Sequence, residues 1–288
     1  MKSVYYKVVL LSGFMLSCGT VYGFDFGQEL NKALKENVQE KIGKNPGAAA
    51  NVLSGIVGTS QEEEVAIGKQ IAGNLLGASP LVKDKRLQKY INNVGRWVAS
   101  QSERPDLPWH FGVIESKDIN AFAAPGGYIF VTRGLYQQLQ NEAALAGVLA
   151  HEIGHVIRQH HLKILQQSSL VALGGEALSR QVGNNEKVQQ LIGSGAEVVA
   201  RSLDKNAEFE ADSIAVVLSA RAGYDPFSFP EVLQGIGHIA KGDNSVELLF
   251  KTHPHPDERL EKLDVAMDDR LDNVKGLTLD KRFYRLNP

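Results

Sequence analysis

The pentapeptide from His151 to His155 has a pattern that can bind a catalytic metal. It reads H-E-x-x-H within a stretch of helical periodicity, and residues four apart lie on one helix face with Cβ atoms about 5–6 Å apart. Both imidazoles can therefore bind one Zn²⁺, and Glu152 beside them can act as general base toward a water on that metal. The alternative is a surface helix with two solvated histidines.

The residues around the motif favour a buried helix. Asn141 is a good N-cap, and Glu142 suits the positive end of the helix dipole. Gly154 costs about 1 kcal/mol relative to alanine in a helix interior, so we expect another element to pack closely there. Apolar residues recur at helical spacing, namely Leu145, Val148, Leu149, Ile153 and Val156.

Composition indicates a globular protein without nucleic-acid-binding character. The chain has 288 residues, of which 43% are hydrophobic, so it can bury a sizeable core. The formal net charge is -2, and lysine and arginine are scattered along the sequence. No basic patch therefore predicts a nucleic-acid partner.

The N-terminal segment predicts export and a periplasmic location. Lys2 and Lys7 precede the mostly apolar residues 8–20, which are too few to span a bilayer comfortably. We expect residues 1–23 to be a cleaved signal peptide. The alternative is a lipoprotein signal that ends before Cys18, the only cysteine, which would then carry a lipid anchor.

Periodicity beyond this segment predicts a mainly helical α+β domain. Residues 24–60 are assigned to an N-terminal extension and residues 61–288 to a catalytic domain. Helical spacing runs over 62–76 and again after Asp84. Strands are predicted at 109–115, 121–124 and 128–132, with Pro125-Gly126-Gly127 as a turn. A small sheet of about three strands thus precedes the H-E-x-x-H helix.

A third metal ligand is expected downstream, because a catalytic zinc has three protein ligands and an open position. Glu208 and Asp212 are four apart in a helical stretch, so one can bind the metal while the other supports it. The alternative for this pair is a solvated helix face. Glu210 lies about 200° round the helix from Glu208, and His160 and His161 are predicted to be ordinary surface residues.

The segment His253-Pro254-His255-Pro256 predicts an extended loop that ends before a helix near Asp257. A rigid loop of this kind can place a histidine in a cleft. The alternative is an exposed proline-rich loop.

Together these motifs resemble one family of zinc metallopeptidases, which includes the CAAX prenyl protease, HtpX, BepA and LoiP. The resemblance covers about residues 61–270 and implies a zincin-like fold in a soluble periplasmic branch. It rests on N-A-F-A-A-P-G-G at 120–127, on H-E-I-G-H, on E-x-x-A-D at 208–212, and on H-P at 253–254 followed by E-R at 258–259.

The resemblance implies one zinc per chain, with His151, His155 and Glu208 as its ligands and Glu152 as the catalytic base. It makes Asp212 the residue that supports a ligand from behind. It places His253 and Arg259 near the reacting carbonyl, and in some relatives the loop histidine instead caps the zinc and holds the enzyme inactive.

The expected reaction is endoproteolysis of unfolded or misassembled cell-envelope proteins. An extended substrate would pair with the strand that carries Asn120, Ala121, Phe122 and Ala123. The outer membrane and its assembly machinery are candidate partners. The alternative function is that of a zinc-binding assembly factor or holdase without proteolysis.

Two departures from the family are visible. Many relatives carry Ser-Arg before the third ligand, whereas this chain has Asp204-Lys205, and lysine lacks the two-pronged guanidinium. The chain also lacks the tetratricopeptide repeats of BepA-like relatives, so substrate capture by such repeats is not expected.

Overall fold

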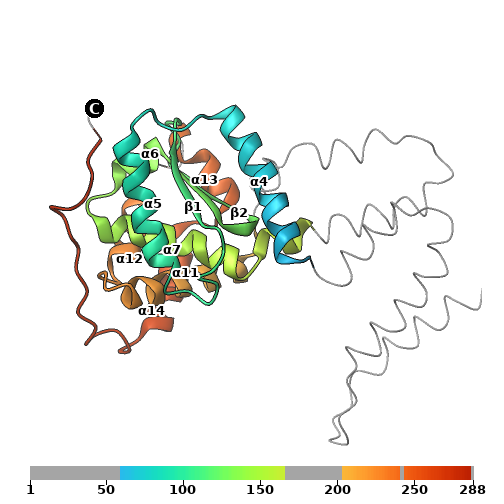
Figure 1. Cartoon of the computed structure of the whole chain (residues 1–288). Coiled ribbons are helices and arrows are strands. Elements are labelled where there is room, and N and C mark those ends of the chain that lie inside the picture. Colours follow the sequence, from blue (N-terminus) through green and yellow to red (C-terminus); the bar gives the residue numbers. More distant parts are fainter. Residues whose placement is uncertain (1–58, 166–202, 241–242, 287–288) are drawn as a thin grey trace, which may run out of the picture. The chain divides into compact units, whose positions relative to one another are not determined.

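The structure, a computed structural model, describes residues 59–165, 203–240 and 243–286 (Figure 1). The predicted signal peptide, Cys18 and residues 24–58 of the predicted extension lie outside the described residues. Within the described part, none of the helices combines the length and apolar character that crossing a membrane requires.

A three-stranded mixed sheet precedes the H-E-x-x-H helix, as predicted. Its strands are β1 (His110–Ile114), β2 (Ala121–Ala124) and β3 (Tyr128–Thr132), in the order β1-β3-β2. β1 runs parallel to β3, and β2 runs antiparallel to it. Gly126 and Gly127 have φ values of 71° and 95° in the short 3-10 turn η1 (Pro125–Gly127), where glycine avoids the strain of a left-handed backbone.

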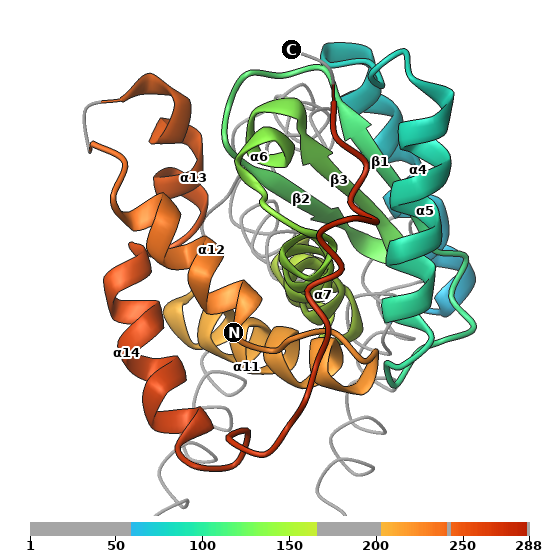
Figure 2. The same cartoon turned by 90° about the vertical axis from the view of Figure 1, so that its left-hand side faces the viewer.

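Helices cover both faces of this sheet, which explains why nearly all strand residues are buried. Successive side chains of a strand point to opposite faces. Phe122 and Phe130 pack with Ile71 of α4 (Gln61–Ala78), whereas Ala121 and Val131 belong to the main core. That core is shared with α5 (Lys85–Ala99) and α7 (Glu142–Ile157). Figure 2 shows α7 nearly end-on beside the sheet.

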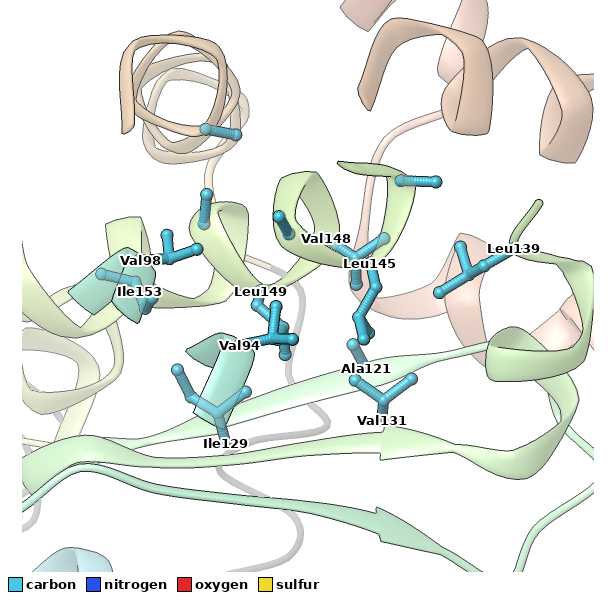
Figure 3. Packing of buried hydrophobic residues seen from close by; sticks show 14 of the residues in the cluster. Val94, Val98, Ala121, Ile129, Val131, Leu139, Leu145, Val148, Leu149 and Ile153 are labelled. Atoms are coloured by element: carbon cyan, nitrogen blue, oxygen red, sulfur yellow. The ribbon is translucent and has the colours of Figure 1, made fainter. Parts of the chain in front are cut away.

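Helix α7 is the central element of the core. All its residues up to Val156 are buried, and Leu145, Leu149 and Ile153 point toward the sheet and α5 (Figure 3). The Asn141 side chain accepts a hydrogen bond from the Ala144 N–H at 2.7 Å, so the predicted N-cap is confirmed. The continuous burial means that the polar residues of H-E-x-x-H must find partners inside the protein.

The remaining helices pack around α7 and against one another. α6 (Arg133–Gln138) follows β3, and α11 (Lys205–Arg221) packs against α7. α12 (Ser228–Gly237), η2 (Asn244–Val246), α13 (Glu247–Thr252) and α14 (Pro256–Met267) follow in chain order (Figure 2). The helix expected near Asp257 begins at Pro256, because proline suits the first helical position and the His255 side chain caps the Asp257 N–H.

Close packing of α7 on α11 explains the glycine in the motif. A Cβ at Gly154 would lie 3.2 Å from Cα of Ala211, tighter than ordinary van der Waals contact. The expectation that an element packs closely at Gly154 is confirmed. This approach brings the middle of α11 to the face of α7 that carries the two histidines.

Buried carboxylates fix both ends of α7. At its start, Glu142 accepts hydrogen bonds from the hydroxyls of Tyr90 and Tyr224 at 2.9 and 2.8 Å, and it pairs with Arg282 of the C-terminal segment. Just after its end, Gln159 donates to Glu64 of α4 at 3.1 Å. The helix that carries the motif therefore has little freedom to move.

Candidate metal centre

Four side chains from three parts of the chain converge on one point. α7 supplies His151 and His155, α11 supplies Glu208, and the loop before α14 supplies His253. One ligand atom from each lies within 4.8 Å of the others, and all four residues are buried. Because these four donor atoms already lie close together, they could bind one ion without a large movement of the chain.

The spacing of the donors fits a metal ion. The Nε2 atoms of His151 and His155 are 3.0 Å apart, and they lie 3.7 and 3.5 Å from the oxygens of Glu208. Ligands about 2.0–2.1 Å from a tetrahedral metal lie about 3.3–3.4 Å from one another. The observed separations bracket this value.

Glu208 gives independent support for a cation. Both of its carboxylate oxygens are buried and have no hydrogen-bond partner among the described residues. Burial raises the pKa of Glu208 to about 8, with Arg259 opposing the rise. A buried carboxylate without donors is costly, and a bound cation would provide the missing partner.

Asp212 lies behind His151, one helical turn after Glu208. Its Oδ1 is 2.9 Å from Nδ1 of His151 and accepts a hydrogen bond from Nη2 of Arg259, while its Oδ2 accepts one from Nε of Arg259 at 2.9 Å. Burial alone would raise the pKa of Asp212, but Arg259 holds it well below its usual range. An ionised Asp212 can accept a hydrogen bond from Nδ1–H of His151, and the unprotonated Nε2 of that ring then faces the cluster.

Glu152 is buried beside the cluster. It lines one small pocket with Glu208 and His253, and a second, mostly apolar pocket with His151 and His253. Burial raises its pKa to about 8, and the charge of Arg259 counteracts part of this rise. A carboxyl group that ionises near neutrality has the proton affinity that a general base needs.

His253 occupies the fourth position of the cluster. Its Nδ1 is 2.8 Å from the Thr252 hydroxyl, and its Nε2 is 3.9 Å from Oε2 of Glu208. Of the two arrangements that the resemblance implied for this histidine, this geometry corresponds to the capping one. Arg259 lines the same apolar pocket, but its Nε and Nη2 are already engaged by Asp212.

Strand β2 borders the cluster with an edge available for pairing. Thr132 N–H donates to the carbonyl of Asn120 at 3.0 Å. Because alternate residues turn their backbone groups toward the partner strand, Ala121 and Ala123 turn theirs away from β3. Ala121, Phe122 and Ala123 line the small pocket with Glu152, whereas Asn120 is fully buried and its Oδ1 accepts the Ala121 N–H.

An apolar pocket next to the cluster is a feature that sequence reasoning missed. Phe229 of α12 stacks on His151, with ring centroids 5.5 Å apart. Most of the apolar lining comes from α6, α7, α12 and α13, chiefly Leu135, Val148, Phe229, Leu233 and Leu249, while β2, the loop before α14 and α14 complete the pocket. The periodicity of each helix predicts an apolar face, but only the packing shows that these faces enclose a pocket beside a metal site.

The prediction that His160 and His161 are surface residues is wrong. They are only 6% and 7% exposed. Nδ1 of His160 lies 2.9 Å from Nδ1 of His155, and His161 lines the small pocket with Glu152 and Glu208. The prediction assumed an uninterrupted helix, whereas α7 ends at Ile157 and Gln159 adopts a left-handed φ of 56°.

The Asp204-Lys205 departure has a simple structural outcome. Asp204 is the N-cap of α11, and its Oδ1 accepts from the N–H groups of Asn206 and Ala207. Lys205 is exposed and pairs with Glu258 of α14 at 2.6 Å. Neither side chain enters the cluster, so the departure leaves the candidate ligands intact.

A family model described as Peptidase family M48 matches residues 85–266, which include every candidate ligand. The chain is also similar to curated proteins with peptidase names. It is 33% identical over 208 residues to the Beta-barrel assembly-enhancing protease of Escherichia coli (strain K12), across 69% of this chain and 42% of that protein.

Two further relatives extend this similarity. The Metalloprotease LoiP of Escherichia coli (strain K12) is 28% identical, over 62% of this chain and 68% of that protein. The Mitochondrial metalloendopeptidase OMA1 of Arabidopsis thaliana is 27% identical, over 62% of this chain and 36% of that protein. The chain spans less than half the length of the Beta-barrel assembly-enhancing proteases that it matches.

Proposed function

Because the chain belongs to peptidase family M48, we propose that it is a zinc metalloendopeptidase that cleaves unfolded or misassembled proteins of the cell envelope. The observation that carries the proposal is the convergence of His151, His155 and Glu208 beside the buried Glu152. The name of the Beta-barrel assembly-enhancing relatives and the predicted export signal support the envelope setting, and the name of the LoiP relative supports the metalloprotease activity.

We assign zinc, one ion per chain, as the metal. Two imidazoles and one carboxylate with a further position for water are the ligand set of catalytic zinc sites. When bound, zinc supplies a Lewis acid that makes water nucleophilic near neutral pH. His151, His155 and Glu208 hold it, and Asp212 keeps His151 in the orientation that directs Nε2 inward.

Glu152 moves the proton. It takes a proton from the attacking water and later delivers it to the leaving amine of the cleaved peptide bond. The burial of Glu152 strengthens its electrostatic interaction with the water and with the leaving amine, because charges attract more strongly where water is scarce. A group in this role typically contributes about 10²–10⁴-fold to the rate.

The edge of β2 binds the substrate as an additional strand. The outward carbonyl of Ala121 and the outward N–H and carbonyl of Ala123 recognise an extended backbone whatever its side chains are, whereas the Ala121 N–H is already donated to Asn120. Such recognition selects segments that are unfolded, since a folded protein has few free strands to offer. The apolar pocket around Phe229 would accept one apolar side chain of the bound segment.

The carbonyl that is attacked lies between this strand and the loop before α14. Arg259, which borders the apolar pocket, is the group that we assign to its developing negative charge, whereas His253 stands in the capping position of the cluster. For Arg259 this is an additional task, because two of its nitrogens already hold Asp212.

Cleavage of casein by the purified protein tests the proposal. We expect cleavage to stop when zinc is removed with a chelator and to return when stoichiometric zinc is added. Suppression of aggregation of a client protein is measured in the same samples. If aggregation is suppressed but casein stays intact with zinc bound, the protein is a holdase and the peptidase proposal is wrong.

A further inference from the structure

The candidate ligand His155 is tied to a second histidine and, through it, to a carboxylate. Nδ1 of His155 lies 2.9 Å from Nδ1 of His160. On the other side of the ring, Nε2 of His160 lies 3.3 Å from Oε2 of Glu210. The three side chains therefore form a continuous line that ends at the metal position.

The backbone after α7 makes this line possible. In an uninterrupted helix, a residue five positions after His155 would lie about 140° round the axis from it. The helix instead ends at Ile157, and Gln159 takes a left-handed φ of 56°, which is uncommon for a residue other than glycine. The next helical segment begins at His160, whose ring turns back toward His155.

The proton positions along this line follow from the chemistry of neutral imidazole. A metal in the cluster would take the lone pair on Nε2 of His155, and the proton of this ring would then lie on Nδ1 and be donated to His160. Nδ1 of His160 must then be the acceptor, and its own proton lies on Nε2, directed at Glu210. One arrangement of protons satisfies every group.

We propose that His160 and Glu210 form a positioning relay that fixes the tautomer and orientation of His155. The relay parallels the direct contact of Asp212 with His151. α11 would thus supply three carboxylates with three tasks, since Glu208 binds the metal, Asp212 orients one histidine, and Glu210 orients the other through His160. Partners of this kind raise the basicity and fix the orientation of a ligating imidazole.

Glu210 is held in place from its outer side. Its Oε1 pairs with Nε of Arg158 at 2.9 Å, and Arg158 also pairs with Glu103 at 3.0 Å. Glu103 has no contact with His160 among the described residues, although it shares the same arginine. This makes Glu103 a matched control for loss of a carboxylate in the same ion-pair network.

Zinc affinity, measured by competition with a chelating dye of known affinity, tests the relay. We expect His160→Leu to raise the zinc Kd about 10–100-fold, because Nδ1–H of His155 loses its acceptor. His160→Asn should recover part of this loss, since its carbonyl can replace Nδ1 as the acceptor. Glu210→Ala should weaken zinc binding to a smaller extent, and Glu103→Ala should leave it unchanged.

A double-mutant cycle separates a relay from two unrelated contributions. If the relay operates, Glu210→Ala has no further effect on zinc affinity once His160 is leucine. An equal effect of Glu210→Ala in both backgrounds overturns the proposal, as does wild-type affinity of His160→Leu. Thermal unfolding of the metal-free variants shows whether each is folded. If His160→Leu does not fold, Glu210→Ala still tests the proposal, because Glu210 is exposed.

The relay rests on the proposed metal site, and the same zinc titration distinguishes failure of the relay from failure of the metal site. Failure of the wild-type protein to bind zinc overturns both. Tight binding by the wild type together with unchanged binding by His160→Leu and Glu210→Ala overturns the relay alone.

Discussion

At the scale of single residues, the two candidate histidine ligands are each held from behind by a defined partner. Asp212 faces His151 and Arg259, and His160 faces His155, so each imidazole has one nitrogen engaged and the other directed inward. Both oxygens of Glu208, by contrast, are buried without a donor among the described residues. This contrast between the held histidines and the unsatisfied carboxylate marks the metal position.

His253 gives the first prediction. Because its Nε2 belongs to the four-donor cluster, it occupies the position that substrate and water would need. We expect His253→Ala to increase the rate of casein cleavage, since the fourth position is then open. A fall in kcat with zinc retained would instead assign His253 to the reacting carbonyl.

At the scale of elements, two ion pairs join α11 to α14 and differ in burial. Asp212 with Arg259 is almost completely buried, whereas Lys205 with Glu258 is exposed. Both pairs connect the same two helices. They therefore allow a buried and an exposed ion pair to be compared across one helix–helix contact.

We expect Asp212→Ala to lower the free energy of unfolding of the metal-free protein by about 3–5 kcal/mol, because it leaves the Arg259 charge buried and unpaired. Lys205→Ala should change it by less than about 1 kcal/mol. Urea unfolding of both variants checks this. Equal effects of the two substitutions would show that burial of the pair is not what stabilises this contact.

The contact of α7 with α11 at Gly154 gives the next prediction. A side chain there must displace the backbone of Ala211. We expect Gly154→Val to destabilise the protein by about 1–3 kcal/mol and to weaken zinc binding, because Glu208 moves with α11. Calorimetric unfolding and zinc titration measure the two effects.

Gly73 in α4 is the control, since nothing lies within 4 Å of the position of its added Cβ. Gly73→Ala should raise stability by up to about 1 kcal/mol through helix propensity. A zinc affinity of Gly154→Val equal to that of the wild type would contradict the idea that close helix packing sets the ligand geometry.

Local signals in the sequence predicted most of the elements and narrowed the third ligand to Glu208 or Asp212, and the family resemblance, not the spacing, selected Glu208. The caps at Asp84 and Asn141, the period-2 strands and the i,i+4 pairs are short-range patterns, and the structure contains each of them. The relay was missed because it depends on a single left-handed residue, Gln159, which no propensity signals. The apolar pocket was missed because its walls come from helices far apart in the sequence.

At the scale of the whole described domain, buried ionisable groups link stability to pH. Burial raises the pKa of Glu152 and of Glu208 to about 8 in the metal-free protein. In the unfolded chain the pKa of a glutamate side chain is about 4.3. Between these values the two carboxyl groups bind more protons in the folded protein than in the unfolded chain, so their contribution to the free energy of unfolding falls as pH rises. Burial lowers the pKa of His151, His155 and His253, which has the opposite effect at pH values where the histidines of the unfolded chain are protonated.

We expect the stability of the metal-free protein to fall by about 1 kcal/mol per pH unit between pH 7 and 8, because the histidines of the unfolded chain have lost most of their protons in that range. Glu208→Gln should reduce this slope, because one of the two groups no longer titrates. Bound zinc should nearly abolish the contribution of Glu208, since the carboxylate then stays ionised in the folded state. A flat profile for the metal-free wild type from urea unfolding would refute this linkage.

The most direct test of the central claim is the Glu152→Gln variant, loaded with zinc and compared with the wild type. Glutamine keeps the shape of the side chain but cannot accept the proton of water. We predict one zinc per chain in both proteins by elemental analysis, and casein cleavage about 10²–10⁴-fold slower in the variant. Cleavage at the wild-type rate with zinc bound would contradict the account.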